Sequence, residues 1–226
     1  MSELTLVLDG STYATSVALL RDKTIIAERQ APSDSASRRD SAGDPLVPLI
    51  QECLSSKGLN ARDLNRIFCG AGPGSFTSLR IAASVGKGIA SAIGIELFAV
   101  PSLLLTVAGL PEPPAPRNYL SVLPAMRSES FAALVTVENN GAIELRGDAR
   151  IVPDEQLEAV ASGDRAVLIG PGKRVDALPL ARGAARVLEG ILSSGPVDLA
   201  SWEPAYGRLA EAQVRWEAAH GRPLKA

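Results

Sequence analysis

A short proline-rich segment divides the chain of 226 residues into two stretches of similar length. Residues 111–116 read PEPPAP, and four prolines in six positions cannot continue a helix or a central strand. On each side of this segment, alternating apolar residues and turn signals predict elements in the same order. We therefore predict two lobes of related structure, residues 1–110 and residues 111–226, of which the second carries a C-terminal helix.

The predicted order of elements is βββαβαβ in the first half, and the second half repeats the series βββαβα. In the first half, strands are expected at residues 4–8, 13–20, 24–29, 66–70 and 96–100, with helices over 44–58 and from 76 onward. In the second half, strands are expected at 119–123, 130–138, 142–146 and 166–169, with helices over 154–161 and 181–192. The polar segment 31–43 is expected to be a mobile loop. Paired halves of this kind are the plan of the actin-like superfamily. The predicted class is therefore α/β, a two-lobed actin-like (ASKHA, RNase H-like) fold.

The composition argues against several classes of function. The chain has 23 Lys and Arg against 25 Asp and Glu, so it lacks the basic excess that holds nucleic acid by counterion release. Its one histidine, His220, cannot build a two-histidine metal site, and its place in a polar tail disfavours a Ser-His-Asp triad. Cys53 and Cys69 match no metal-ligand spacing and are expected to be buried thiols.

The sequence also predicts where the protein works. Its opening residues lack a basic segment followed by an apolar run, so no secretory signal is expected. The longest uncharged run, residues 97–110, is shorter than the roughly 20 residues of a membrane span. We expect a cytoplasmic protein without membrane contact.

A cluster of glycines lies between a predicted strand and a predicted helix, at residues 69–76, CGAGPGSF. Such a corner can bind phosphate, because free N–H groups and the helix dipole point at one place. The cluster lacks the Lys-Ser or Lys-Thr of a Walker loop and the spacing of a dinucleotide fingerprint. The favoured alternative is a tight structural corner in which glycines supply positive φ and Ser75 caps the helix. The corner residues are Gly72, Pro73, Gly74 and Ser75.

The helix after this corner has an unusually large apolar surface. At 100° per residue, its polar side chains form one narrow stripe, and small residues recur every four positions from Ala82 to Gly94. Such a row permits close approach of a second helix. Two interpretations stay open: the helix over 44–58 covers this face, or another protein does. The second predicts an interface of Phe76, Leu79, Ala82, Ala83, Gly86, Ala90, Leu46 and Ile50.

The first strand ends in Asp9-Gly10-Ser11-Thr12, which resembles one of the two phosphate loops of an actin-like ATPase. Those enzymes hold Mg-ATP between their halves with an acidic residue from the first strand of each. The second half offers Ala125 and Met126 at the corresponding place, without a carboxylate. One arm alone cannot clamp a metal–triphosphate. Asp9, Ser11 and Thr12 are therefore weak candidates for cofactor binding, and a small ATP-dependent kinase or ATPase is the alternative function.

Residues 72–81, GPGSFTSLRI, followed by Lys87-Gly88, resemble the signature GPGSFTGLRIG…AKGLA of the bacterial TsaB (YeaZ) family. The resemblance extends to Leu6–Asp9, to Val100-Pro101-Ser102 and to a C-terminal P-x-Y-x-R segment with Pro204, Tyr206 and Arg208 in register. Three departures stand out: Ser78 replaces a glycine, Arg39-Asp40-Ser41 replaces a usual histidine, and Ala125–Ser128 lacks the family's aspartate.

The resemblance implies a function in making N6-threonylcarbamoyladenosine in tRNA. It implies a non-catalytic scaffold that pairs with the catalytic homologue TsaD through its first-half helices, in an assembly that includes the ATPase TsaE. It further implies that tRNA is handled by the complex, that no cofactor binds this chain alone, and that any ATP or ADP belongs to the assembled complex. An isolated chain is expected to pair with itself through the same surface.

Overall fold

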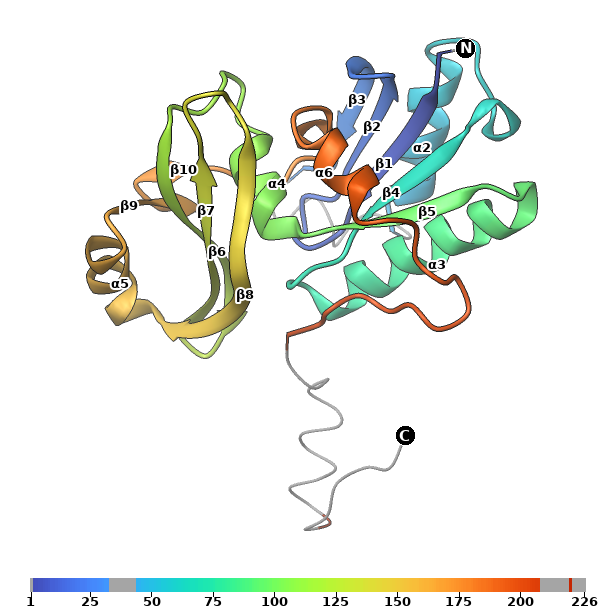
Figure 1. Cartoon of the computed structure of the whole chain (residues 1–226). Coiled ribbons are helices and arrows are strands. Elements are labelled where there is room, and N and C mark those ends of the chain that lie inside the picture. The colour runs from blue at the N-terminus through green and yellow to red at the C-terminus, as the bar shows by residue number, and fades with distance from the viewer. Residues whose placement is uncertain (1, 33–43, 208–219, 221–226) are drawn as a thin grey trace.

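The computed structural model describes residues 2–32, 44–207 and 220 (Figure 1). Most of the predicted loop at 31–43 lies outside these residues, and so do Arg39-Asp40-Ser41 and the motif residue Arg208. Beyond Gly207 the predicted C-terminal helix also lies outside them, apart from His220.

Two five-stranded sheets have the same strand order, each with three antiparallel strands first and two parallel strands after them. The first sheet is β3(Thr24–Gln30)-β2(Ser16–Arg21)-β1(Leu4–Asp9)-β4(Arg66–Gly70)-β5(Glu96–Val100). The second is β8(Ile143–Pro153)-β7(Glu129–Val137)-β6(Arg117–Met126)-β9(Ala166–Gly170)-β10(Val175–Asp176). β4 pairs parallel with β1, and β9 pairs parallel with β6. The duplicated order confirms the predicted α/β, two-lobed actin-like fold.

Helices α2(Leu46–Ser55) and α3(Phe76–Ile93) cover one face of the first sheet, and the 3-10 turn η1(Ala61–Asp63) lies between them in the chain. α2 begins at Leu46 and ends at Ser55, inside the predicted helix over 44–58, and Asp44 Oδ1 accepts the N–H of Leu46 at 2.9 Å. α3 ends at Gly94, whose φ of +71° is the left-handed conformation that favours glycine at a helix end. The alternation of β1 places Leu4, Leu6 and Leu8 against these helices.

The helix α4(Ser102–Ala108) lies between the two sheets, and the sequence did not predict it (Figure 1). All seven of its residues are buried. Burial on every side is typical of a helix enclosed in a core, and it weakens the apolar periodicity by which a helix is recognised in a sequence. α4 packs on β6 and β7, so the core joins the two lobes. No helix of the described residues is long and apolar enough to cross a membrane.

The second half places η2(Asp154–Gln156) and α5(Leu157–Gly163) at the predicted helix over 154–161. The single helix predicted over 181–192 is wrong, because the chain forms η3(Ala181–Ala185) and then α6(Leu188–Ser193). Val187, at φ −116° and ψ +15°, leaves helical geometry between them. η3 packs on β1, β2 and β3, and α6 on β5, so this segment returns to the first sheet. The lobe boundary at residue 110 stays a prediction.

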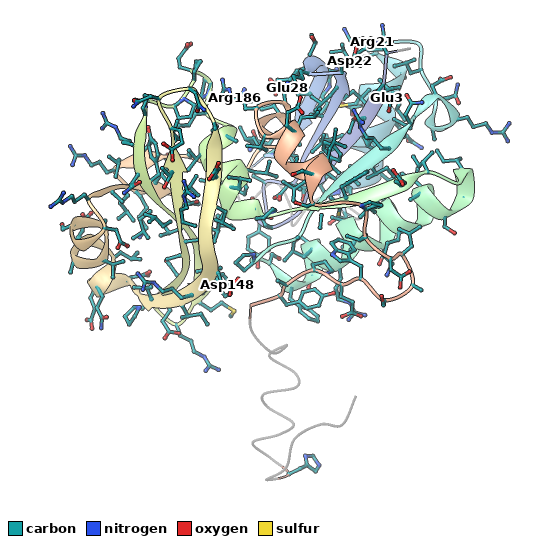
Figure 2. All side chains as sticks on the ribbon, in the orientation of Figure 1. Glu3, Arg21, Asp22, Glu28, Asp148 and Arg186 are labelled. Carbon is teal, nitrogen blue, oxygen red and sulfur yellow. The ribbon has the colours of Figure 1, made fainter. Side chains whose placement is uncertain are left out.

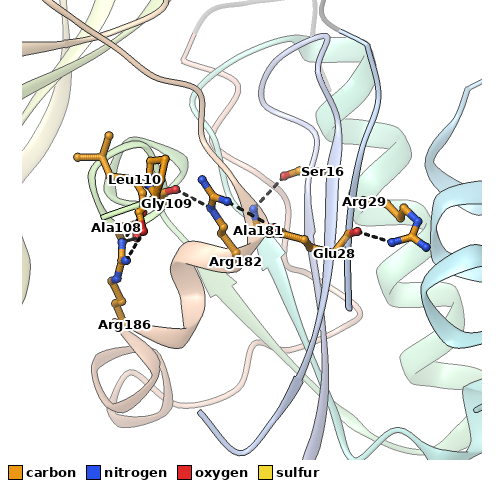
Figure 3. A network of polar contacts seen from close by, with 10 residues as sticks. Ser16, Glu28, Arg29, Ala108, Gly109, Leu110, Ala181, Arg182 and Arg186 are labelled. Carbon is orange, nitrogen blue, oxygen red and sulfur yellow. Dashed lines mark hydrogen bonds and ion pairs between the residues drawn. The ribbon is translucent and has the colours of Figure 1, made fainter. Parts of the chain in front are cut away.

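The two chain crossings between the lobes meet at one place (Figure 3). Arg182 Nε donates to the carbonyl of Gly109 at 2.8 Å, and Arg186 donates to the carbonyls of Ala108 and Pro111. These carbonyls follow the last turn of α4, where no intrahelical donor reaches them. The two arginines of the returning segment therefore hold the end of α4.

Two glycines allow the crossings to touch. A Cβ at Gly183 would lie 2.7 Å from the backbone nitrogen of Gly109 and 2.9 Å from the carbonyl carbon of Ala108. Neither backbone atom can rotate away, as the end of a side chain can. The closeness of the two crossings therefore depends on the absence of a side chain at Gly183.

We predict that Gly183→Ala destabilises the protein by about 1–3 kcal/mol, because the new methyl group overlaps backbone. Gly190→Ala is the matched control: it lies in α6, with no atom within 4 Å of the new Cβ, and should stabilise by up to about 1 kcal/mol. Urea unfolding followed by circular dichroism measures both. Equal stability of the two variants would contradict the close crossing.

Candidate functional site

The row of small residues on α3 faces the protein's own sheet, which corrects one prediction. Ala82 and Ala90 have no exposed surface, and a side chain added at Gly86 would press on the side chains beneath it. The Cβ position at Gly86 is already 3.2 Å from Leu97 Cδ1 and 3.6 Å from Leu8 Cδ1. Small residues are needed here because α3 lies close to β1 and β5, not because a partner approaches.

The other predicted interface residues are also engaged within the chain. Leu79 and Ala83 of α3 and Leu46 and Ile50 of α2 are buried, so with Ala82, Gly86 and Ala90 they cannot form an exposed docking face. Phe76 is half-buried, and its ring packs against Tyr206 with 4.6 Å between the centroids. Of this set, Ile50 still borders an open surface.

That surface is a groove between α2 and α3, with a volume of about 480 Å³. Its walls are mostly apolar and carry no charged side chain; they are Val47, Ile50, Gln51, Leu54, Ser55, Leu59, Asn60, Ala61, Val85 and Ile89. Val47 is 45% exposed, which is high for a large aliphatic side chain. Val85 and Ile89 lie on α3 beside the buried row rather than in it. The groove is therefore the apolar surface of these two helices that the described chain leaves open.

The glycine corner is built by contacts with the loop after β1 and with α4. Gly72 has φ +80°, and its peptide bond to Pro73 is cis. A Cβ at Gly74 would overlap the carbonyl of Ser11, which accepts the N–H of Ser75 at 2.7 Å. The corner thus needs its glycines, as predicted, and the N–H and carbonyl of Gly72 and the N–H of Ser75 are already paired with this chain.

Ser75 stands at the N-cap of α3, but its hydroxyl does not bond a backbone N–H of the helix. It donates instead to the hydroxyl of Ser78 at 3.2 Å, so the predicted side-chain cap is wrong. Ser78 is the residue that replaces a glycine of the family signature, and it is buried beside Gly10. The substitution supplies a partner for Ser75.

Asp9 is buried at the end of β1, and both of its carboxylate oxygens are used. Oδ1 accepts the N–H and the hydroxyl of Ser11, at 3.0 and 2.6 Å, and Oδ2 accepts the hydroxyl of Ser102 at 2.6 Å. Ser102 Oγ in turn accepts the N–H of Gly72 at 3.1 Å. Burial raises the pKa of Asp9 above its ordinary value of 3.8, against the opposing effect of these hydrogen bonds. The carboxylate therefore joins β1, the corner and α4.

Of the other two weak cofactor candidates, Ser11 is buried and bonded to Asp9. Thr12 is half-buried, with no hydrogen-bond partner for its hydroxyl among the described residues. At the end of β6, the second lobe presents Leu123 and Ala125, which pack in an apolar cluster with Leu103 of α4. This cluster contributes no carboxylate opposite Asp9; among the described residues, Glu129 of β7 is the carboxylate that pairs with the end of β6, opposite Met126.

Both predicted buried thiols are confirmed. Burial raises the pKa of Cys53 to about 11, and burial with the nearby charge of Asp9 raises the pKa of Cys69 further. Neither sulfur is a thiolate near neutral pH, so neither is a ready nucleophile. Among residues 2–32, 44–207 and 220, no three His, Cys, Asp or Glu side chains are grouped to hold a metal ion.

The family model described as "TsaD: tRNA N6-adenosine threonylcarbamoyltransferase" matches residues 36–163. The tRNA threonylcarbamoyladenosine biosynthesis protein TsaB of Escherichia coli is 28% identical over 137 residues, 60% of this chain and 56% of that protein. The protein of the same name from Bacillus subtilis is 27% identical over 169 residues, 72% of this chain and 68% of that protein. The aligned part thus spans little more than half of the E. coli relative.

Solved structures match over more of the chain. YeaZ from Pseudomonas aeruginosa superimposes with a TM-score of 0.71 and 24% identity, covering 90% of this chain and 99% of that one. A structure described as similar to peptidase YeaZ, from the same organism, gives a TM-score of 0.74 at 22% identity, covering 91% and 100%. At this identity the likeness concerns the fold.

We predict that the stability difference between the native protein and Asp9→Asn depends on pH. A raised pKa means that the folded state holds the Asp9 proton more tightly than the unfolded chain does. The native protein therefore loses stability relative to Asp9→Asn as pH rises from about 4 through the folded pKa. Urea unfolding of both proteins at roughly pH 4.5 and roughly pH 7, which span this window, measures the difference in free energy of unfolding.

Asp148→Asn is the control for removing a carboxylate, because Asp148 is exposed on β8 (Figure 2). If the stability of the native protein relative to Asp9→Asn stayed constant over this range, or rose with pH, the fold would not favour the protonated form of Asp9.

Proposed function

The chain belongs to the TsaB/YeaZ family, and from this premise we propose that it serves in threonylcarbamoyladenosine biosynthesis in tRNA as a non-catalytic subunit that pairs with a TsaD homologue. The observation that carries the pairing is the uncharged groove between α2 and α3. It replaces the buried row of small residues as the surface that the partner contacts.

The nature of the groove supports an obligate or long-lived partner. Its open apolar side chains come from two helices, and such a surface is stabilised when helices of another subunit exclude water from it. A TsaD homologue is a suitable partner, because residues 36–163 match the TsaD model and so include both groove helices. Homologous subunits can bury equivalent helix pairs against one another around a pseudo-twofold axis. Two copies of this chain would use the same groove when the partner is absent.

The chemistry of the described residues supports a subunit without catalysis of its own. Asp9, the acidic residue at the end of the first strand, already accepts hydrogen bonds from Ser11 and Ser102 on both of its carboxylate oxygens. The opposite lobe offers an apolar cluster at the corresponding place, and the described residues hold no group of three His, Cys, Asp or Glu side chains that could bind a metal ion. ATP or ADP then belongs to the assembled complex, with TsaE as its ATPase.

The charge of the chain supports an indirect relation to tRNA. With a net charge of −2, it gains little from counterion release and would leave most phosphate contacts to its partners. In this proposal the complex holds the tRNA, the TsaD homologue performs the transfer, and this chain keeps the TsaD homologue in its assembled form.

We predict that Val47→Arg weakens pairing with the TsaD homologue by roughly 30-fold or more, because it buries a charge in an apolar contact. Val47 is exposed in the free chain, so the variant should fold normally. Ile151→Arg is the matched control, since Ile151 is 40% exposed on β8 of the second lobe. Size-exclusion chromatography with light scattering and titration calorimetry measure pairing.

The same two variants also test the role in the cell. Cells that depend on Val47→Arg should contain less threonylcarbamoyladenosine in their tRNA, by mass spectrometry of its nucleosides, whereas Ile151→Arg should restore the native level. Full pairing by Val47→Arg would refute the groove as the interface. Normal modification in cells lacking the chain altogether would refute the function.

The alternative, a small actin-like kinase or ATPase, retains one supporting observation, the unpartnered hydroxyl of Thr12 beside the Asp9 loop. Calorimetry of the isolated chain with Mg-ATP separates the two functions. We predict no metal-dependent binding at micromolar nucleotide, because the second carboxylate arm is absent. Tight, magnesium-dependent binding that is lost in Asp9→Ala would instead favour the kinase.

A further inference from the structure

Residues 196–207, which we call the strap, leave α6 and run along α3 to the junction of the two lobes (Figure 1). The N–H of Val197 donates to the carbonyl of Leu97 in β5 at 2.8 Å. Further along, Nζ of Lys87 donates to the carbonyl of Trp202 at 2.9 Å. Lys87, a member of the polar stripe of α3, thus holds this segment against the helix.

The end of the strap rests on two aromatic rings, one from each lobe. Tyr206 packs on Phe76, the first residue of α3, and the guanidinium of Arg80 lies over the Phe76 ring, 5.4 Å from its centroid. Gly207, at φ +70°, is so close to Phe131 of β7 that a Cβ there would overlap the ring. The strap therefore spans the junction between the lobes.

The backbone of the strap also closes the glycine corner. The N–H of Ala205 donates to the carbonyl of Ala71 at 2.8 Å. The carbonyl oxygen of Ala205 occupies the space that a Cβ at Gly72 would need, 2.5 Å away. The absence of a side chain at Gly72 thus serves two purposes, a positive φ and a place for the strap.

The end of the strap has fewer buried residues than the strands of the two sheets beside it. Glu203, Ala205 and Gly207 are exposed, and Tyr206 is half-buried, so among residues 203–207 Pro204 is the residue that is buried. Segments with few buried contacts and exposed backbone open at a lower free energy than the whole molecule unfolds. By contrast, Phe131 and Leu103 beneath it belong to the buried cluster that joins α4 to the second lobe.

We propose that residues 203–207 are a latch, which closes the glycine corner and the junction of the lobes and opens locally while both sheets stay folded. In the closed state the latch covers Phe76, Gly72 and Phe131. In the open state these two rings and the backbone of the corner become accessible to solvent or to a ligand. This proposal stands on the contacts of the strap and does not depend on the proposed function.

Hydrogen exchange of the full chain, followed by mass spectrometry, tests the latch. Gly207→Ala forces a methyl group against Phe131, and Tyr206→Ala removes the contact with Phe76 without strain. In both variants, the peptide covering residues 203–207 should exchange at least about tenfold faster, because local opening frees the N–H of Ala205 from the carbonyl of Ala71. Peptides of β7 and α2 should change by less than about twofold, because their amides stay bonded within the sheet and the helix.

Gly172→Ala is the matched control for strain. Gly172 has nearly the same φ, +65°, but no atom lies within 4 Å of its Cβ position. It should leave exchange of the peptide covering residues 203–207 unchanged. The latch is refuted if Tyr206→Ala leaves the exchange of that peptide unaltered. It is equally refuted if exchange rises evenly over the whole chain, because the strap would then be part of the global core.

Discussion

The burial of α4 between the two sheets is the constraint on which the rest of the molecule depends. Because all seven residues of α4 are buried, its end groups cannot reach water and must be satisfied by other elements. At its start, Ser102 bonds Asp9 and the corner at Gly72. At its end, the carbonyls are held by Arg182 and Arg186 of the returning chain. The polar groups nearest the junction of the lobes are thereby committed to holding α4.

This commitment explains why the junction of the lobes differs from the nucleotide cleft of an actin-like ATPase. A catalytic carboxylate must keep lone pairs free for a metal or a proton. The two carboxylate oxygens of Asp9 instead accept hydrogen bonds from three donors of its own chain. Opening the lobes would also expose the apolar cluster around Leu103 and Phe131, at a cost of about 25 cal/mol per Å² of apolar surface. A fixed junction suits the proposed scaffold role, because the proposed docking face would then not move when a ligand binds.

The sequence predicted well those elements whose two faces differ in environment. β1 alternates between the helix-covered face and the α4 face, and the repeat of strand order about the proline-rich segment correctly indicated the duplicated fold. α4 was not predicted, because a helix buried on all sides lacks the alternation of apolar and polar faces that marks a helix in a sequence. The row from Ala82 to Ala90 correctly indicated a close approach but was assigned to the wrong neighbour. A row of small residues indicates that another surface comes close to the helix. Only the tertiary structure shows whether that surface belongs to the same chain.

α3 gains its importance from having three different flanks. Its buried row fixes it to the sheet, Val85 and Ile89 border the groove, and Lys87 holds the strap. At 100° per residue, Lys87 lies about 180° around the helix from the mean direction of Val85 and Ile89. A partner in the groove and the latch therefore contact opposite sides of one helix, held in place by close packing on β1 and β5. Because such packing resists small displacements, pressure on one flank is transmitted to the other instead of being absorbed within the core. Any coupling between docking and the latch would run through the rigid seating that the small residues of α3 provide.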